Sequence, residues 1–341
     1  MSIINQVVKG GGTTPTGSIS ITNNGTYDVT DKATAVVNVP TTAPAHYLER
    51  TVDANGKLLV SPNIINLNGV TDVGDYALQN AYFGITFPVN TGVSFPLTEI
   101  SGGNACGNMF YYCARLTSAN LPSLTTISGS YSCGYMFYGC TGLTSVNLPV
   151  LTTISGDNAC SYMFSYCTVL TSFDLSALTT ISGGYGCQSM FQDCTSLTSA
   201  NLPSLTTISG FFACQSMFQS CSPLTSFDLS ALTTISGDYA CQSMFQYCPL
   251  TSADLSALTT VSGSCACQQM FCNCISLATV YIGGTTAIDF GTNTDQFTDM
   301  FLDCTQNIDV YAPAANQAEI EAMSGYPNFG GTGTVTWHWR S

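Results

Sequence analysis

Cysteines are the side chains in this sequence whose spacing could most directly support chemistry. Of 17 cysteines, four stand close together at Cys265, Cys267, Cys272 and Cys274 and form a C-x-C-x4-C-x-C run. Clustered thiolates bind zinc, but structural zinc sites favour pairs separated by about two to four residues. Cys267 and Cys274 also continue a cysteine pattern that recurs along the chain. We therefore interpret the run as structural and expect neither a metal nor another cofactor.

The recurring pattern is an octet such as CQSMFQSC, from Cys214 to Cys221. Cys214, Met217, Phe218 and Cys221 fall at i, i+3, i+4 and i+7, which is one face of a helix. The two cysteines of such a helix would lie ~10.5 Å apart along its axis, too far for a disulfide within the octet. We expect buried free thiols, with bridges between neighbouring octets as the alternative. The other cysteines of this ladder are Cys106, Cys113, Cys133, Cys140, Cys160, Cys167, Cys187, Cys194, Cys241 and Cys248.

A second candidate is a column of acidic and amide side chains at equivalent positions, Asn120, Asn147, Asp174, Asn201, Asp228 and Asp254. Neighbouring strands lie ~4.8 Å apart, so Asp228 and Asp254 would repel each other unless water or a cation lay between them. Calcium binds several carboxylate oxygens, but no calcium-loop spacing is present. A solvated polar ladder is favoured, and Asp174, Asp228 and Asp254 are kept as candidate ligand-binding residues.

The third candidate is aromatic. Val335, Trp337 and Trp339 share one face of an alternating segment that also contains His338. Trp337 and Trp339 could bind sugar rings, meet another subunit or close the C-terminal end of the fold, and we favour the last of these.

Catalysis and two kinds of partner are disfavoured. The two histidines, His46 and His338, lie far apart in sequence, and no hydrolase, metalloprotease or phosphate-binding motif is present. The net charge is −14 and no lysine or arginine occurs between Arg115 and Arg340, so nucleic acid is excluded as a partner. No apolar run is long enough for a signal peptide or a membrane span. We expect a protein that is not an enzyme and does not insert into a membrane.

These side chains are positioned by a repeat. Met-Phe pairs recur at intervals of 27 residues five times, then 26, then 30, beginning at Met109, Met136, Met163, Met190, Met217, Met244, Met270 and Met300. A fixed period of this length predicts a solenoid, in which each unit buries its apolar face against its neighbours. Within a unit, Leu143–Pro149 and Leu151–Ser155 predict two short strands, with Leu143, Val146 and Leu148 facing inward. A Ser-Gly turn and the octet helix follow.

The segment MFYGCTGLTSVNLP, Met136 to Pro149, resembles the leucine-rich repeats of the BspA-like family. The resemblance covers about residues 70–310 and rests on Phe137, Cys140, Leu143, Val146, Leu148 and Pro149. It implies a mixed α/β, right-handed leucine-rich-repeat coil, with a parallel sheet on one face and short helices on the other. It also implies adhesion or recognition. The unit here is longer than the family's, has Met where Ala is common, and carries the additional first cysteine.

The N-terminal segment Ile21–Pro40 resembles a small β module of phage tail and virion proteins, with NNGT as a turn between alternating strands. The sequence then predicts five parts: an attachment leader (1–17), the β module (18–40), a linker or hairpin (41–59), the solenoid (60–310) and a C-terminal cap (311–341) that contains a short helix at Asn316–Met323.

The expected function is to display the repeat domain on a surface. The main interpretation is a phage virion protein, such as a tail or head fibre. It would attach to other virion proteins through residues 1–40 and present the repeats to a host-surface glycan or protein, as a trimer or another homo-oligomer. The alternatives are a BspA-like adhesin on a bacterial cell surface and a purely structural decoration of the virion.

Overall fold

The computed structural model describes residues 97–341, residues 78 and 91–95, and the backbone of seven short strands nearer the N-terminus. β1 (Ser18–Ile21) and β2 (Thr26–Tyr27) flank the predicted NNGT turn but do not pair with each other. β1 pairs in parallel with β3 (Thr34–Asn38), and β2 pairs in parallel with β5 (Val52–Asp53). Further parallel pairs join β3 to β6 (Ile65–Asn66), and β4 (Thr42–Ala43) to β7 (Asp72–Val73). The leader and most of the linker lie outside the described residues.

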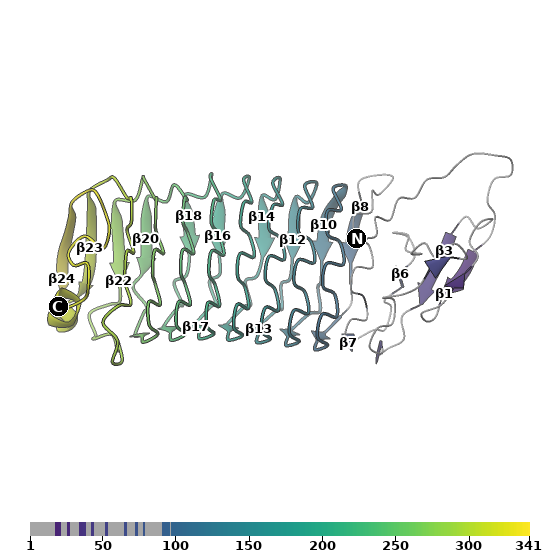
Figure 1. Cartoon of the computed structure of the whole chain (residues 1–341), viewed down its shortest axis with the longest axis horizontal. Helices are drawn as coiled ribbons and strands as arrows, with labels where there is room; N and C mark the ends of the chain where they lie inside the picture. The colour runs from purple at the N-terminus through teal and green to yellow at the C-terminus, as the bar shows by residue number, and fades with distance from the viewer. Residues whose placement is uncertain are drawn as a thin grey trace.

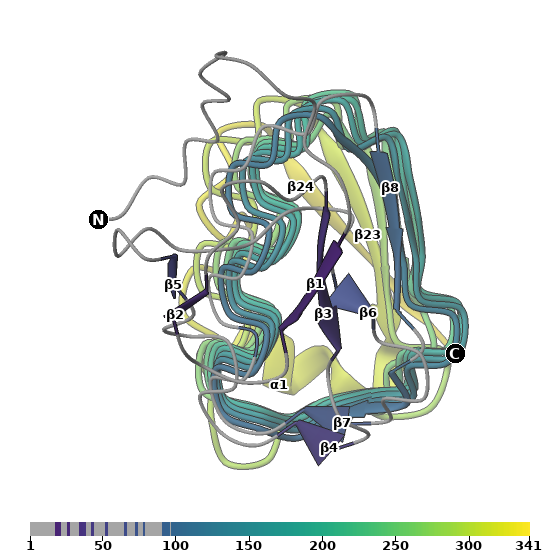
Figure 2. The same cartoon turned by 90° about the vertical axis from the view of Figure 1, so that its right-hand side faces the viewer.

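From residue 91 onward the chain is a straight parallel β-solenoid (Figure 1). One side, here called the long-strand face, is formed by β8 (Thr91–Ser94), β10 (Leu116–Asn120), β12 (Ser145–Asn147), β14 (Ser172–Asp174), β16 (Ser199–Asn201), β18 (Ser226–Asp228), β20 (Ser252–Leu255), β22 (Thr279–Ile282), β23 (Ile308–Pro313) and β24 (Val335–Arg340). The short-strand face is formed by β9 (Glu99–Ile100), β11 (Thr126–Ile127), β13 (Thr153–Ile154), β15 (Thr180–Ile181), β17 (Thr207–Ile208), β19 (Thr234–Ile235) and β21 (Thr260–Val261). Figure 2 shows these two faces and a third, winding side in end view.

The predicted strands are confirmed, with shorter bounds. In the unit that contains β12 and β13, Val146 is 3% exposed and Leu143 and Leu148 are fully buried. Ser145 pairs with Ser172, and Asn147 with Asp174, one repeat further along the chain. The register places equivalent residues beside each other, so each inward-facing column continues from coil to coil.

The predicted octet helices are wrong. Each octet forms overlapping turns along the winding side, here called the turn face. Its amides alternate between two partners: Met109 N bonds to Cys106 O in the same coil at 3.1 Å, whereas Phe110 N bonds to Met136 O in the next coil at 2.7 Å. A positive φ recurs at every fourth residue, as at Tyr131, Tyr135 and Gly139. A helix is ~10 Å wide and cannot stack at the ~4.8 Å spacing of parallel strands, whereas a flat ribbon of turns can.

Within the described residues, helix is confined to η1 (Ala314–Asn316) and α1 (Gln317–Glu321). This confirms the short helix predicted in the C-terminal segment. No helix in the described part of the chain has the length and apolar character needed to cross a bilayer.

The core is built from columns of identical side chains. Stacked phenylalanine rings follow one another from Phe110 to Phe137 at 5.1 Å and from Phe137 to Phe164 at 5.3 Å between centroids. All 17 cysteines are free and buried. The second cysteine of an octet also links two coils, because Cys140 Sγ donates to Phe110 O at 3.1 Å. The apolar columns therefore hold the coils together along the whole solenoid.

Glycine is required where each coil enters the turn face. A Cβ built on Gly183 would lie 2.1 Å from Gly156 O, and one built on Gly156 would lie 2.3 Å from Gly129 O. The Ser-Gly signal of each repeat therefore marks a close approach of two backbones that leaves no room for a side chain.

The long-strand face is interrupted twice. β14 is not hydrogen-bonded to β16, nor β18 to β20, among the described strands. Each break follows a strand that carries phenylalanine. Phe173 of β14 stacks on Phe191 at 4.5 Å and on Phe218 at 6.0 Å, and Phe227 of β18 stacks in the same way on Phe245 and Phe271. Each of these rings therefore contacts the phenylalanines of the two following coils, at the same places where the strand pairing is interrupted.

Candidate functional site

The acidic column of the long-strand face serves local turns. Asp174 Oδ1 accepts a hydrogen bond from Ser176 N at 3.0 Å, and Asp228 and Asp254 accept in the same way from Ser230 and Ser256. Each aspartate begins an Asp-Leu-Ser sequence. In the other units the sequence is Asn-Leu-Pro, and proline has no N–H to donate. The choice between aspartate and asparagine therefore follows the residue two positions later.

Asp228 and Asp254 lie on either side of a break in the sheet, because their strands, β18 and β20, are not hydrogen-bonded to each other. The amide positions interact directly where strands do pair: Asn147 Nδ2 donates to Asn120 Oδ1 at 2.8 Å. Across the described residues, no three histidine, cysteine or acidic side chains are grouped as a metal site would require. The three aspartates of the column each cap their own turn, and their role as ligand-binding residues stays a prediction.

The dense cysteine run is divided between two environments. Cys267 and Cys274 lie in the core columns, and Cys274 Sγ donates to Phe245 O at 3.2 Å. Cys265 Sγ instead contacts Asp295 Oδ2 at 3.5 Å, and Cys272 Sγ accepts from Gln246 Nε2 at 3.4 Å. The four thiols do not converge on one point.

The buried thiols are also poor nucleophiles and ligands. Burial raises the pKa of Cys133, Cys221 and Cys267 to about 12. Burial first, and then Asp295, raises the pKa of Cys265. Since the thiolate is the reactive and metal-binding form, these side chains remain protonated and act as apolar core groups.

Trp337 and Trp339 lie in the terminal strand β24 and pack against the end of the core. Their rings stack at 5.7 Å, and Trp337 Nε1 donates to Pro327 O at 3.0 Å. On the opposite side of β24, His338 stacks on Tyr311 at 4.6 Å and contacts Asp309 at 2.8 Å. Both tryptophans are partly buried against the core, and their role as a cap stays a prediction.

A group of tyrosines on the turn face was not predicted from the sequence. The first three octets contain Tyr111, Tyr112, Tyr135, Tyr138, Tyr162 and Tyr166, here called the tyrosine patch, whereas the next four octets contain only Tyr247. Tyr112 is 54% exposed and Tyr166 is 42% exposed. The sequence contains a signal for this group, because the composition of the octets changes along the chain. Tyrosine-containing octets such as CGYMFYGC are followed by glutamine-containing octets such as CQSMFQSC.

The patch is an ordered cluster of rings. Tyr111 stacks on Tyr138 at 5.0 Å with an interplanar angle of 7°, and Tyr135 stacks on Tyr162 at 4.8 Å. Tyr112 is nearly perpendicular to both members of the first pair, at 88° and 89°. Rings in fixed mutual orientation form a surface that loses little conformational entropy on binding.

Tyr112 lies against a glycine. A Cβ on Gly139, which has φ +67°, would lie 2.5 Å from Tyr112 Cδ1, so only glycine leaves room for this ring. The equivalent residue one repeat before Gly139 is Tyr112 itself, and the one after is Tyr166. One side of the Tyr112 ring is therefore packed on the protein while the other faces solvent.

Raised pKa values keep the hydroxyls of Tyr111, Tyr138 and Tyr166 protonated at neutral pH. Burial first, and then Tyr112, raises the pKa of Tyr111, and burial with the neighbouring tyrosines raises that of Tyr138 to about 12. Asp193 is the main cause of the raised pKa of Tyr166. The patch therefore offers flat rings and protonated hydroxyls, with the Asp193 carboxylate beside Tyr166 at its edge.

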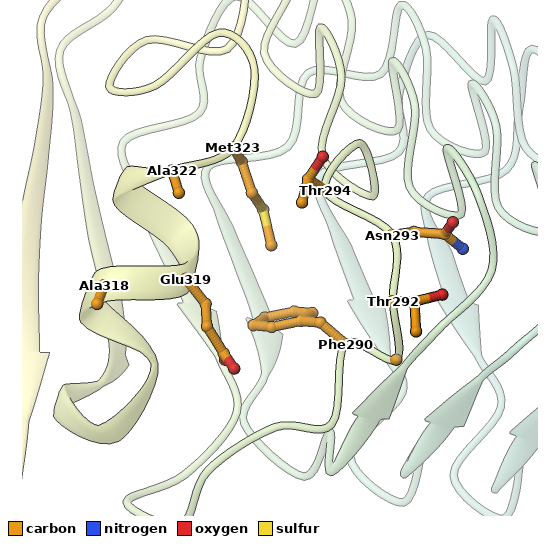
Figure 3. A pocket seen from close by; sticks show the side chains of 9 residues that line it. Phe290, Thr292, Asn293, Thr294, Ala318, Glu319, Ala322 and Met323 are labelled. Carbon is orange, nitrogen blue, oxygen red and sulfur yellow. The ribbon is translucent and has the colours of Figure 1, made fainter.

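A separate pocket of about 350 Å³ lies near the C-terminal end (Figure 3). One wall is the segment from Phe290 to Thr294, and the other is formed by Ala318, Glu319, Ala322 and Met323, from α1 and the residues that follow it. Its position beside the cap is unique in the described solenoid, because the repeats contain no equivalent of α1.

Comparison with known proteins places the repeats in a family. The model of the BspA type leucine rich repeat region matches in six copies, over residues 104–240, 161–278 and 214–312. The chain belongs to this family. Its coils are solenoid units of the kind that commonly serve as non-enzymatic binding scaffolds.

Among solved structures, the chain is similar to a leucine-rich repeat protein from Bacteroides ovatus ATCC 8483, whose crystal structure is at 1.19 Å resolution. The identity is 16%, over 80% of this chain and 88% of that chain, and the TM-score is 0.32. None of the curated proteins matches.

Proposed function

We propose that this protein is a non-enzymatic adhesin of the BspA-like class, displayed on a bacterial cell surface, and that it binds a host-surface glycan through the tyrosine patch. The observation that carries the proposal is the restriction of the patch to three adjacent octets. A residue needed for the fold recurs in every coil, as the buried cysteines do, whereas a binding surface occurs once.

Family membership supports a recognition role, and the chemistry of the patch supports a glycan. The face of an aromatic ring is electron-rich and attracts the weakly positive C–H groups on one face of a sugar ring. The exposed side of Tyr112 provides such a face. The neighbouring hydroxyls can exchange hydrogen bonds with sugar hydroxyls. The Asp193 carboxylate beside Tyr166 would repel an anionic glycan, which favours a neutral one.

Display on a virion is the second candidate. The observation that favours it is the resemblance of Ile21–Pro40 to a module of phage tail and virion proteins. In that setting the N-terminal segment would attach the chain to other virion proteins, and the same patch would bind the host surface. Immunogold labelling of producing cells and of purified particles distinguishes the two locations.

Binding is tested with Tyr112→Ala on an array of neutral host glycans, followed by titration calorimetry on the best ligand. We expect affinity to fall about tenfold, equivalent to ~1.4 kcal/mol. Tyr247→Ala is the matched control, because Tyr247 is 51% exposed at the equivalent position of a later octet but has no tyrosine in its own octet or the adjacent ones. Equal affinity of both variants and the parent protein would refute the role of the patch.

A further inference from the structure

The pocket beside α1 presents a single charged group. Its lining residues are apolar or neutral except for Glu319. Phe290 and Met323, each 5% exposed, form its apolar part. In Figure 3 the Glu319 carboxylate and the Phe290 ring border the same space, and Met323 extends toward the ring.

A buried amide fixes the position of that carboxylate. Asn316 is 1% exposed, and its side chain is held from two sides: Oδ1 accepts from Ile288 N at 2.6 Å, and Nδ2 donates to Ile288 O at 2.9 Å. Nδ2 also donates to Glu319 Oε2 at 2.5 Å. The amide orients one carboxylate oxygen, and within the described chain the other, Oε1, has no hydrogen-bond partner.

Among the described residues, no lysine or arginine is recorded in an ion pair with this carboxylate. No lysine or arginine occurs between Arg115 and Arg340. Arg340 is already engaged, because Nη1 donates to Gly283 O at 3.1 Å and the guanidinium lies 5.6 Å from the centre of the Tyr281 ring. The net charge of −14 adds an attractive field for cations around the whole molecule.

We propose that this pocket binds a small alkylammonium ion. The ammonium group would donate to Glu319 and lie near the Phe290 ring, where the electron-rich face attracts a cation. The alkyl stem would cover Phe290 and Met323. Alkylamines have pKa values of about 10.4, like a lysine side chain, so the ligand carries its charge at neutral pH. The residues differ from those of the tyrosine patch, so the inference is independent of the proposed adhesin function.

The test uses n-hexylamine on the full chain, with binding followed by methyl NMR signals of methionine. We expect a dissociation constant on the order of 1 mM, typical of so small a ligand. The neutral isostere n-hexanol should bind at least about tenfold more weakly if the ammonium contributes as a charged hydrogen-bond donor. Nα-acetyl-lysinamide forms a second arm: binding comparable to hexylamine would extend the ligand class to lysine side chains of proteins, and weaker binding would restrict it to free amines.

Glu319→Gln removes the charge with little change in shape and is expected to weaken hexylamine binding at least about tenfold. Glu321→Gln is the control, because Glu321 is on the same short helix but does not line the pocket. Ala322→Trp, which fills the pocket while retaining Glu319, should abolish binding. The proposal is overturned if hexanol binds as well as hexylamine, if Glu319→Gln and Glu321→Gln behave alike, or if Ala322→Trp retains full affinity.

Discussion

The first three octets and the next four form the same backbone but present different surfaces. In the first group the outward positions carry the tyrosine patch, whereas in the second they carry mainly glutamine and serine. Gln188, Gln215, Gln242 and Gln268 are joined side chain to side chain by hydrogen bonds of 2.6 Å. The buried columns of Cys, Met and Phe continue through both groups without change. Fold and surface are therefore specified by separate positions of the repeat.

The largest expected effect is loss of stability at alkaline pH, and it should be shared by both regions. Burial raises the pKa of Cys133 in the tyrosine region and of Cys221 in the glutamine region to about 12, compared with about 8.5 in an unfolded chain. Because the folded pKa lies above the unfolded one, only the unfolded chain ionises these thiols between the two values. The stability that comes from burying them is therefore fully present below pH ~8.5 and is lost as pH rises toward 12. Each such thiol costs ~1.4 kcal/mol per pH unit in that window.

Urea unfolding followed by circular dichroism between pH 7 and 11 measures this loss. A single transition whose midpoint falls steeply above pH ~9 is expected. Two transitions, or a midpoint that does not change up to pH 11, would show that the common core does not control stability in both regions.

The second effect is local and should also be equal in the two regions. Gly156→Ala and Gly210→Ala each place a Cβ about 2.2–2.3 Å from a carbonyl oxygen of the preceding coil, and we expect each to cost roughly 3 kcal/mol or more. Gly184→Ala is the control, because its nearest neighbour is a side-chain oxygen at 3.3 Å. Thermal melts of the three variants test the comparison, and a large difference between the first two would contradict a shared backbone.

The smallest effect distinguishes the surfaces. Tyr135→Ala removes one stacked ring, and Gln215→Ala removes one rung of the glutamine ladder, so each should cost ~1 kcal/mol of stability. Only the tyrosine variant should weaken glycan binding. If Gln215→Ala reduced binding as strongly, recognition would extend over the whole turn face and the distinction drawn here would be lost.

The strands could be predicted because their evidence is local. Leu143, Val146 and Leu148 alternate with polar residues, and the fixed interval between units sets the parallel register. The octet was wrongly predicted to be a helix because Cys214, Met217, Phe218 and Cys221 have the spacing of one helical face. A ribbon of turns whose conformation repeats every four residues buries the same positions. The deciding constraint is the narrow spacing between coils on all sides, which no single octet reveals.

The candidate sites were harder to predict, because residues were selected by their chemical type and not by how often they recur among the repeats. Asp174, Asp228 and Asp254 were chosen as candidate ligand-binding residues because they are carboxylates. The serine two residues after each aspartate indicates that the aspartate accepts a hydrogen bond within a turn. Tyr112 could have been recognised from the change in octet composition, but its support by Gly139 needs the stacked coils. Glu319 and Phe290 come together only because the closing segment folds back across the last coils.

The two interruptions at Phe173 and Phe227 have a mechanical consequence. Under tension along the axis, a uniform sheet would resist equally at each interval, but here fewer backbone bonds connect β14 to β16 and β18 to β20. A stretched molecule should extend first between β14 and β16 and between β18 and β20, which leaves three segments of the solenoid that unfold later. Single-molecule force spectroscopy would record this as discrete steps before complete rupture.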